Sequence, residues 1–465
     1  MVPAVLCLIV VLVLSFCLFY TKNKQHNYPP CIRGWLPWFG VAFQFGRAPL
    51  DFVEKARAKY GPVFTVLAAG KRLTFITLHE DFNTFFTSKD VDFQQAVQDP
   101  VRHTASIEKD SFNKNHHMCH AFIKERLTRS NLSVFFADLC DEFNNQLKLM
   151  KQEGSDDLAD IVRCLMYPAV MSNLLGKECC PNCQTEKEEF KKHFLVYDEG
   201  FEYGTQLPEF FLREWANSKT WLLTFMENII FQAQKNKPSK ADAKTLLHHL
   251  MLNITDKFVS NYGLLMVWAS LANAIPITFW TLGFILSEPS VYKTAMQEIT
   301  SVFACKDTTN ITVTESDLGS LTYIKCCMLE SIRLRSPGAI TRKVVQPLRI
   351  QNYIIPPGDL LMLSPFWAHR NPKLFPDPEK FIPERWKHSD LEKNVFLEGF
   401  VAFGGGRYQC PGRWYALMEI QMFVSLTLYK YEFTLLDALP KPSLHHLVGT
   451  QQPEGPCRVH YKQIK

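Results

Sequence analysis

A glycine-rich stretch that ends in one cysteine constrains this chain more than any other part of its sequence. The stretch reads Phe403-Gly404-Gly405-Gly406-Arg407-Tyr408-Gln409-Cys410-Pro411-Gly412. Glycines allow positive φ angles and a close approach of the backbone to a flat cofactor. A helix-forming run follows, and amide groups at the start of a helix favour a thiolate. Such a loop suits a cysteine that binds haem iron, because thiolate ligation promotes cleavage of an O–O bond.

The competing interpretation is a glycine-rich turn beside a buried structural cysteine, since the chain contains 14 cysteines. The spacing favours the haem site, because Phe403, Gly406, Cys410 and Gly412 follow the pattern Phe-x-x-Gly-x-x-x-Cys-x-Gly. This pattern resembles the haem-binding signature of the cytochrome P450 family. The resemblance implies a mainly α (α+β) cytochrome P450 fold with haem b as its cofactor. It also implies that Cys410 is the metal ligand, and that Phe403 and Gly406 shape the ligand loop.

The first residues of the chain predict a membrane anchor. Residues 2–20 are apolar and uncharged, and Lys22 and Lys24 follow them. As a helix, this run is about 28 Å long, close to the thickness of a bilayer core. A cleaved signal peptide would normally carry its basic residues before the apolar run. Positive charge after the run keeps the remaining chain in the cytosol. We therefore expect an uncleaved single-pass anchor at residues 1–21, in the endoplasmic reticulum membrane.

The rest of the chain is predicted to form a linker and one catalytic domain. Residues 22–49 are rich in proline and resemble the hinge of membrane-bound members of the family. The haem-thiolate catalytic domain is expected over residues 50–465. Strands are predicted at 63–67 and 73–77, whereas residues 80–320 are mostly helical. A small β-rich part that precedes and follows a large helical part favours the α+β class.

Composition excludes some classes of function. A chain of 465 residues with 47% hydrophobic residues can bury a large core. The net charge is only +5 and is spread along the sequence, so nothing indicates a nucleic-acid partner. Weak basicity is compatible with an anionic membrane surface or an acidic protein partner.

A second apolar segment, residues 258–287, contains no charged residue and is long enough to cross a membrane. A second crossing would separate the earlier helices from Cys410, although both must belong to one domain. Asn273 and Pro276 also lie within the segment, and such residues are costly in lipid but useful beside a buried cofactor. We therefore expect a central core helix that is kinked by Pro276.

Two motifs predict an ion-pair network that supports the cysteine loop. Glu330 and Arg333 lie at positions i and i+3 of a predicted helix, where they face each other. An exposed pair of this kind contributes little, but the neighbouring apolar residues indicate burial. With Pro383-Glu384-Arg385, the pair resembles the family's Glu-x-x-Arg and Pro-Glu-Arg motifs. The resemblance implies that Glu330, Arg333 and Arg385 fix the loop that carries Cys410.

Several residues are candidates for binding the haem propionates. Arg342 resembles the family's propionate-binding arginine by position, and a guanidinium suits a carboxylate. Tyr408 replaces the family's usual basic residue, although it can still donate one hydrogen bond. The tryptophan that the family usually places with a basic residue is missing from residues 116–129. The candidates for that role are His120, Lys124 and Arg126.

The central helix departs from the usual proton-relay motif. Most monooxygenases of the family carry Ala/Gly-Gly-x-Asp/Glu-Thr there, whose acid and alcohol relay protons to bound oxygen. The matching residues here are Ala272-Asn273-Ala274-Ile275-Pro276. Asn273 can hydrogen-bond to an oxygen ligand or to water, but it is not an acid. We expect Asn273 to lie over the oxygen face of the haem as the catalytic candidate. The alternative is that Asn273 only satisfies backbone groups freed by Pro276.

This motif leaves two reaction classes open. It resembles a subgroup formed by sterol 7α- and 12α-hydroxylases and by prostacyclin synthase, an isomerase that takes no electrons. A wider resemblance to oxysterol 7α-hydroxylases covers segments 29–66, 197–204, 261–282, 341–386 and 435–462. It implies a microsomal monooxygenase that hydroxylates an oxysterol, 24-hydroxycholesterol at the 7α position, in cholesterol catabolism and bile-acid synthesis. The implied partners are molecular oxygen, membrane lipid and an NADPH–cytochrome reductase. A haem-thiolate isomerase of a lipid peroxide is the alternative, and a non-catalytic haem sensor is a third.

Overall fold

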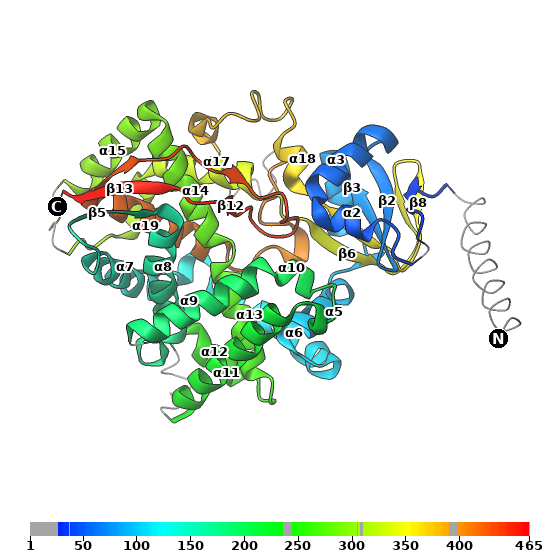
Figure 1. The fold of residues 1–465 in the computed structure, drawn as a ribbon, viewed down its shortest axis with the longest axis horizontal. Coiled ribbons are helices and arrows are strands. Elements are labelled where there is room, and N and C mark those ends of the chain that lie inside the picture. The colour runs from blue at the N-terminus through cyan, green and yellow to red at the C-terminus, as the bar shows by residue number, and fades with distance from the viewer. Residues whose placement is uncertain are drawn as a thin grey trace, which may run out of the picture. The chain divides into compact units, whose positions relative to one another are not determined.

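The structure, a computed structural model, describes residues 27–464 except 37, 182, 236–243, 305, 307–309 and 390–398. The predicted anchor at residues 1–21 lies outside the described residues. The described chain divides into two compact units, which are coloured along the sequence in Figure 1. The smaller unit comprises the residues up to Val97 with Gly338–Ala368 and Leu444–Leu447. The larger unit comprises Gln98–Pro337, His369–Ser443 and the residues from Val448 onward.

A six-stranded sheet with the order β1-β2-β3-β9-β6-β4 organises the smaller unit. Its strands are β1 (Cys31–Ile32), β2 (Val63–Ala68), β3 (Lys71–Ile76), β4 (Val91–Asp92), β6 (Ile340–Val344) and β9 (Leu360–Leu363). β2 and β3 form an antiparallel hairpin, in agreement with the predicted strands. Its turn residues Ala69 and Gly70 have φ of 48° and 74°, as a two-residue turn of this kind requires. β9 pairs with β3 in parallel, so blue and yellow segments lie side by side in Figure 1.

Helices and a second hairpin complete the smaller unit. They are α2 (Ala42–Arg47), α3 (Pro49–Tyr60), α4 (Phe82–Thr87) and α18 (Pro365–His369, whose last residue belongs to the larger unit), with η1 (His79–Asp81), β7 (Leu348–Ile350) and β8 (Tyr353–Ile355). Pro49 stands in the first turn of α3, where its missing N–H group costs nothing. Val53 of α3 packs with Phe64 and Phe75 of the sheet in one buried cluster. The core of this unit therefore lies between α3 and the β2–β3 hairpin.

The larger unit is mostly helical, as predicted. Its longer helices are α5 (Gln94–Ala105, which begins in the smaller unit), α6 (Lys109–Arg126), α7 (Ser133–Lys148), α8 (Leu158–Leu175), α9 (Gln184–Glu199), α11 (Arg213–Lys235), α12 (Leu246–Asn253), α13 (Val259–Leu271), α14 (Ala274–Ser287), α15 (Pro289–Phe303), α17 (Thr322–Arg335) and α19 (Arg413–Lys430). Shorter helical turns are α10 (Phe201–Gly204), α16 (Glu315–Ser320), η2 (Arg129–Asn131), η3 (Lys177–Cys179), η4 (Glu209–Phe211), η5 (Pro383–Trp386) and η6 (Gly406–Tyr408). The helices enclose a core that is built around α14, as the buried residues of that helix show.

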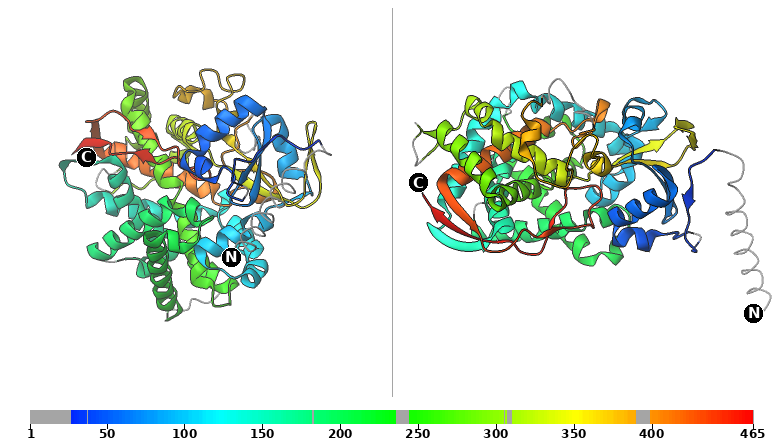
Figure 2. Two further views of the ribbon diagram at one scale, coloured as in Figure 1. Left: turned by 45° about the vertical axis from the view of Figure 1, so that its right-hand side comes forward. Right: turned by 90° about the horizontal axis from the view of Figure 1, so that it is seen from above.

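Two small sheets belong to the larger unit. β10 (Tyr431–Leu435), β13 (Arg458–Gln463) and β5 (Glu153–Asp157) form an antiparallel sheet in the order β10-β13-β5. β11 (Lys441–Pro442) pairs with β12 (Pro453–Glu454). The sheet brings the red C-terminal strand beside the cyan β5, which is visible in the right-hand view of Figure 2.

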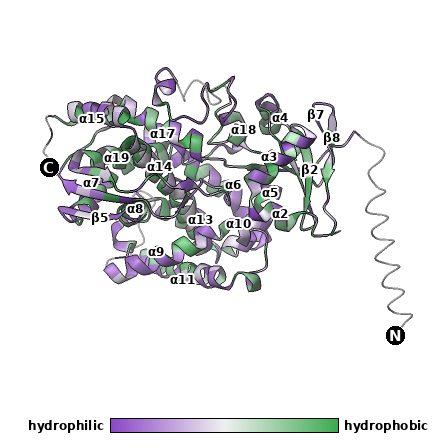
Figure 3. Ribbon diagram, turned by 45° about the horizontal axis from the view of Figure 1, so that its top comes forward, coloured by the Kyte–Doolittle hydropathy of each residue, from purple (hydrophilic) through white to green (hydrophobic). Residues whose placement is uncertain are grey.

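The second apolar segment of the sequence forms the centre of this unit. Leu158–Leu175 and Val259–Ser287 are each long and apolar enough to cross a membrane, but both are mostly buried inside the protein. α14 appears as a strongly hydrophobic helix in Figure 3. The helix is interrupted at Ala272 and Asn273. Pro276 lies in the first turn of α14, and its ring would clash with the carbonyl of residue 272, four positions earlier. The expected kink is therefore a break that lies just before the proline.

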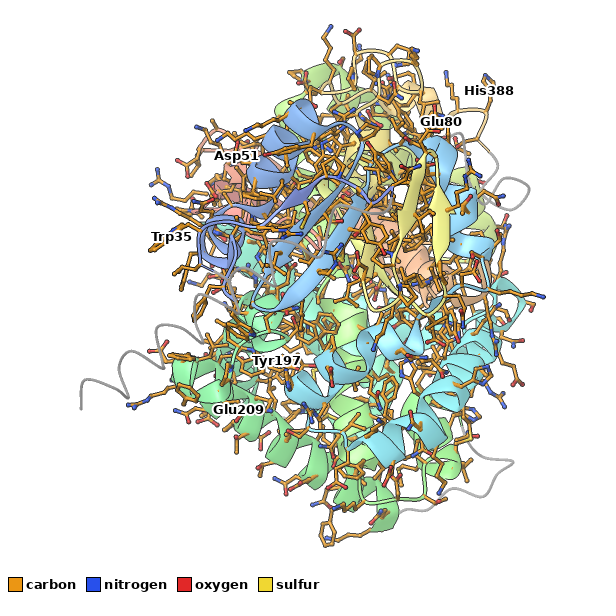
Figure 4. All side chains as sticks on the ribbon, turned by 90° about the vertical axis from the view of Figure 1, so that its right-hand side faces the viewer. Trp35, Asp51, Glu80, Tyr197, Glu209 and His388 are labelled. Carbon is orange, nitrogen blue, oxygen red and sulfur yellow. The ribbon has the colours of Figure 1, made fainter. Side chains whose placement is uncertain are left out.

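Gly204 provides a test of packing in the larger unit. A Cβ atom added there would overlap the ring of Trp215, which is 4% exposed. The indole Nε1 donates to the carbonyl of Tyr197 at 3.0 Å, so the ring cannot move without breaking a hydrogen bond; Tyr197 is labelled in Figure 4. We expect Gly204→Ala to lower the free energy of unfolding by about 1–3 kcal/mol in urea denaturation.

Gly319→Ala is the matched control for this experiment. Gly319 lies in α16, and a Cβ atom there would meet nothing within 4 Å. The substitution should be neutral or stabilise by up to about 1 kcal/mol, because alanine favours a helix. Equal stability of the two variants would show that the contact with Trp215 does not constrain Gly204.

Candidate active site

The loop that carries Cys410 is closed by its own backbone. The N–H group of Cys410 donates to the carbonyl of Phe403 at 2.9 Å, and that of Gln409 donates to Gly406 at 3.3 Å. Gly404 and Gly406 have φ of 67° and 66°, a left-handed conformation that other residues adopt only with strain. The glycines of the sequence motif are therefore explained by the fold of the loop.

The sulfur of Cys410 faces the start of α19. Burial among protein atoms raises the pKa of its thiol, while hydrogen bonds from the N–H groups of Gly412 and Arg413 lower it, as does the charge of Arg413. The residue is nevertheless exposed, so protein crowds the sulfur without closing it off. A sulfur that accepts backbone N–H groups and can still be approached is suited to act as a thiolate ligand.

A polar atom without a partner lies beside this loop. The ring of His120, on α6, packs edge-on against Tyr408 with 5.7 Å between the ring centroids. Its Nε2 is buried and has no hydrogen-bond partner among the residues that the structure describes. Unpaired buried polar atoms are rare in proteins and indicate a missing ligand or water. A haem carboxylate would supply that partner. The accessible Cys410 and the unpaired Nε2 atom of His120 together fit a haem group.

Arg407 of the loop, and the candidates Lys124 and Arg126 on α6, differ from His120 in their surroundings. Nη2 of Arg407 lies 2.6 Å from Nε2 of His117, so this arginine is tied to α6. Lys124 is exposed and Arg126 is partly buried. Of the predicted substitutes for the missing tryptophan, the structure brings His120 into contact with the loop.

A buried ion pair supports the segment before the loop. Glu330 and Arg333 on α17 are both 0% exposed, and two hydrogen bonds of 2.8 Å join them. Three further donors reach the carboxylate, namely Arg385 Nε at 3.0 Å, the N–H group of Ile382 at 3.0 Å and Trp386 Nε1 at 2.8 Å. A buried carboxylate needs this many partners to offset the loss of hydration. The structure thus brings Glu330, Arg333 and Arg385 together as predicted.

Arg333, the other member of the ion pair, fixes the backbone between α18 and η5. Nη1 of Arg333 donates to the carbonyls of His369 and Pro378 at 2.6 and 2.7 Å, and Nη2 donates to that of Lys380 at 3.3 Å. The segment between α18 and η5 forms turns rather than a helix or strand, so its carbonyls need other donors. One guanidinium therefore holds the fold of a segment that lacks its own regular hydrogen bonds.

His369 connects this network to the cysteine loop, and the sequence analysis missed it. Its Nε2 lies 3.2 Å from the N–H group of Val401, and its Nδ1 lies 3.2 Å from the carbonyl of Arg333. A backbone N–H group can only donate, so Nε2 carries no proton and Nδ1–H donates to Arg333. The carbonyl of Val401 accepts from Gly404 at 2.9 Å. His369 therefore links α17 to the glycines of the loop.

The surroundings of His369 keep its ring neutral. Burial, together with the charges of Arg370 and Arg333, lowers the pKa of His369 to about 3. Its ring stacks on Phe400 at 5.1 Å, and Phe400 also contacts Trp386 at 4.7 Å. The sequence signal that could have found it is a histidine at the end of an apolar run, Pro365-Phe366-Trp367-Ala368-His369.

Asn273 lies at the break between α13 and α14 and is exposed. Its side-chain oxygen accepts hydrogen bonds from the N–H group and the hydroxyl of Thr450, at 3.1 and 3.0 Å. The side chain makes no capping bond to α14. The partner of its oxygen is thus a distant segment and not the helix backbone that Pro276 frees, contrary to the alternative interpretation of this residue.

Arg342 belongs to the smaller unit and lies on β6. It is 4% exposed, and its Nη1 donates to the carbonyl of Thr341 at 3.0 Å. The guanidinium lies over the rings of Phe85 and Phe93, 5.2 and 4.7 Å from their centroids. Contacts with aromatic faces stabilise a buried guanidinium group. Its role toward a haem propionate stays a prediction.

Known proteins resemble this chain over most of its length. The family described as cytochrome P450 matches residues 29–459. The 24-hydroxycholesterol 7-alpha-hydroxylase of Mus musculus is 50% identical over 460 residues, which cover 98% of each protein. The enzyme of the same name from Homo sapiens is 51% identical over 453 residues, which cover 96% of each. The solved structure of retinoic acid-bound cyanobacterial CYP120A1 matches with a TM-score of 0.76 at 21% identity, covering 95% of this chain and 100% of the other. That last likeness concerns the fold alone.

The buried ion pair generates the first prediction for this site. Glu330→Gln keeps the shape of the side chain but leaves two guanidinium groups without their counter-charge. We expect the free energy of unfolding to fall by about 3–5 kcal/mol and thiolate-ligated haem to be lost. Urea denaturation and the spectrum of the ferrous carbon monoxide complex measure the two effects.

An exposed ion pair provides the control for this substitution. Asp51 and Lys55 form a pair at 2.6 Å with both side chains largely exposed, and Asp51 is labelled in Figure 4. Asp51→Asn should change the free energy of unfolding by less than about 1 kcal/mol. A Glu330→Gln variant as stable as Asp51→Asn would contradict the role of the buried network.

The neutral ring of His369 predicts a dependence of stability on pH. The unfolded chain binds a proton at this residue below about pH 6.5, whereas the folded protein does not until about pH 3. The stability that His369 contributes is complete above the unfolded pKa. It is lost as the pH falls from there toward 3, by at most about 1.4 kcal/mol per pH unit.

The variant His369→Gln cannot titrate at this position. The difference in unfolding free energy between the wild type and this variant should therefore shrink as the pH is lowered from about 6.5 to about 4.5. Urea denaturation at each pH measures it. His388→Gln is the control, because His388 is exposed and projects outward in Figure 4. A pH-independent difference for His369→Gln would mean that the ring is not held neutral.

Proposed function

The chain belongs to the cytochrome P450 family, and on that premise we propose that it hydroxylates 24-hydroxycholesterol at the 7α position. The observation that carries this proposal is the extended identity to two 24-hydroxycholesterol 7-alpha-hydroxylases. The matched lengths cover 98 and 96% of the chain, so they extend over most of the segments that form the candidate site. The reaction would be a monooxygenation in cholesterol catabolism and bile-acid synthesis, with NADPH as the electron source through a reductase.

The residues around Cys410 serve to bind and position the cofactor. Haem, when bound, supplies the activation of molecular oxygen for insertion into a C–H bond. Cys410 would hold the iron, and the N–H groups of Gly412 and Arg413 favour the thiolate form of its sulfur. His120 and Tyr408 would bind the haem carboxylates. The chain from Glu330 through His369 keeps the loop in place when it is loaded.

Proton supply differs from that of most family members. The positions of the usual acid and alcohol are Ile275 and Pro276, which can neither donate nor accept a proton. Asn273 can orient a water molecule through its amide but has no acidic proton. We propose that water delivers the protons and that Asn273 holds this water on the oxygen side of the site.

We also propose that residues 1–21 anchor the protein in the endoplasmic reticulum membrane, with the catalytic domain in the cytosol. Large aromatic side chains that follow this segment support the proposal. Trp35, Trp38 and Phe43 are 80, 60 and 71% exposed, and Trp35 is labelled in Figure 4. Clustered exposed aromatic groups usually mark a surface that meets lipid or a partner. Membrane lipid would cover them here.

An oxygen-isotope experiment tests the proposed reaction. The purified full-length protein would receive 24-hydroxycholesterol, labelled molecular oxygen, NADPH and the reductase. We expect one labelled oxygen in a new hydroxyl group at the 7α position, and only when the reductase is present. Mass spectrometry of the product measures the label. Rapid turnover of a lipid peroxide without the reductase, and no sterol product, would instead identify an isomerase.

Cys410→Ser is the matched control. Serine preserves the size of the side chain but does not provide a thiolate, so both the labelled product and the thiolate-type carbon monoxide spectrum should disappear. A variant that kept that spectrum would show that another residue is the iron ligand.

A further inference from the structure

Residues 448–452, which we call the C-terminal strap, are hydrogen-bonded to several helices of the larger unit. The N–H groups of Val448 and Gly449 both donate to one oxygen of Glu202, at 2.8 and 3.1 Å. Thr450 binds Asn273. Further bonds run from the N–H group of Gln451 to the carbonyl of Arg335, from Trp280 Nε1 to the carbonyl of Gln451, and from Gln452 Nε2 to Asp198. Each residue of the strap is therefore tied to another element.

The bond from Thr450 determines which way the amide of Asn273 points. The oxygen and nitrogen of an asparagine side chain are similar in shape, and their assignment depends on their partners. A backbone N–H group can only donate, so the atom that faces the N–H group of Thr450 at 3.1 Å must be the oxygen. The hydroxyl of Thr450 donates to the same oxygen at 3.0 Å. Two donors on one atom exclude the flipped amide.

The consequence is that Nδ2 of Asn273 turns away from the strap. Thr450 is 3% exposed, whereas Asn273 is exposed. In the part of the chain that the structure describes, no hydrogen bond occupies the two protons on this nitrogen. The side of Asn273 that is open to a ligand therefore carries donors and no acceptor.

The hydroxyl of Thr450 is itself oriented. Its oxygen lies 3.5 Å from that of Ser336, which can donate to it while the Thr450 hydroxyl donates to Asn273. The N–H groups of the two preceding residues are held by Glu202. The strap therefore presents Thr450 to Asn273 in a defined geometry, although 177 positions separate the two residues in sequence.

We propose that Thr450 is a positioning residue that fixes the amide of Asn273 so that its nitrogen offers hydrogen-bond donors to the oxygen side of the active site. The groups that such a site takes are acceptors, namely a water oxygen, a diatomic ligand or a hydroxyl oxygen of the substrate. The functional part of this proposal rests on the proposed hydroxylase. The orientation of the amide does not, because the Thr450 contacts alone determine it.

Amide hydrogen exchange tests the orientation without any turnover. The N–H group of Thr450 should exchange slowly in the full-length protein, because Asn273 accepts it. Asn273→Ala should speed exchange at Thr450 at least about tenfold. Thr281→Val is the control, because among the described residues the hydroxyl of Thr281 binds only the carbonyl of Ile277 on the same helix. This variant should leave the exchange at Thr450 unchanged. Equal exchange at Thr450 in wild type and Asn273→Ala would overturn the proposal.

The C–O stretching frequency of the ferrous carbon monoxide complex tests the donors. Asn273→Asp keeps an oxygen for Thr450 but replaces the outward NH₂ group by a carboxylate oxygen. The frequency should therefore shift upward, since a donor to the carbon monoxide oxygen is lost. Thr450→Val removes one of the two bonds that fix the amide, and it should broaden the band or split it. An unchanged band in both variants would overturn the placement of the donors.

The third measurement is coupling, the amount of product formed per NADPH consumed. We expect the ratio of product to NADPH consumed to fall about tenfold in Asn273→Asp, to fall less in Thr450→Val, and to stay at the wild-type value in Thr281→Val. Wild-type coupling in Asn273→Asp would overturn the functional part. If the wild-type protein did not oxidise 24-hydroxycholesterol at all, the proposed function would fail, while the exchange and vibrational results would still decide the orientation.

Discussion

The buried ion pair of Glu330 and Arg333 is the interaction on which the rest of the site depends. Both side chains are removed from water completely, which is unfavourable unless every charge finds partners. The carboxylate recruits Arg385 and the guanidinium recruits backbone carbonyls, so the pair organises the irregular segment that leads to the cysteine loop. The ion pair therefore selects one conformation for a segment that has no regular hydrogen bonds of its own.

The side chains of His369 and Asn273 are oriented by the same physical means. The neutral ring of His369 accepts a hydrogen bond from the N–H group of Val401 and donates one to the carbonyl of Arg333. At the break before α14, Thr450 holds the amide of Asn273. In both cases a backbone N–H group, which can only donate, removes an ambiguity of the side chain that it meets. The tautomer of the histidine and the orientation of the asparagine follow from that constraint.

The break before α14 explains why the side chain of Asn273 can reach a distant segment. Pro276 interrupts the helical hydrogen bonding at Ala272. The side chain of Asn273 makes no capping hydrogen bond to α14 and is free to bind another segment. It can meet the C-terminal strap instead. The helix that supplies a proton relay in most relatives of this family here carries an asparagine whose amide is oriented by Thr450. The change concerns a few side chains, whereas the fold is shared with a P450 structure at 21% identity.

The sequence by itself determined the cysteine loop, the residues of the ion-pair network, the β2–β3 hairpin and a central core helix disturbed at Pro276, whereas the structure showed that the disturbance is a break. Each of these follows from local sequence: glycines where positive φ is needed, charges at i and i+3, two short strand-like runs around a glycine turn and a proline within an apolar run. Only the tertiary structure decided the roles of His369, His120 and Thr450. Their partners lie on other segments, and whether two such groups meet depends on how the intervening helices pack, for which the sequence contains no periodic signal.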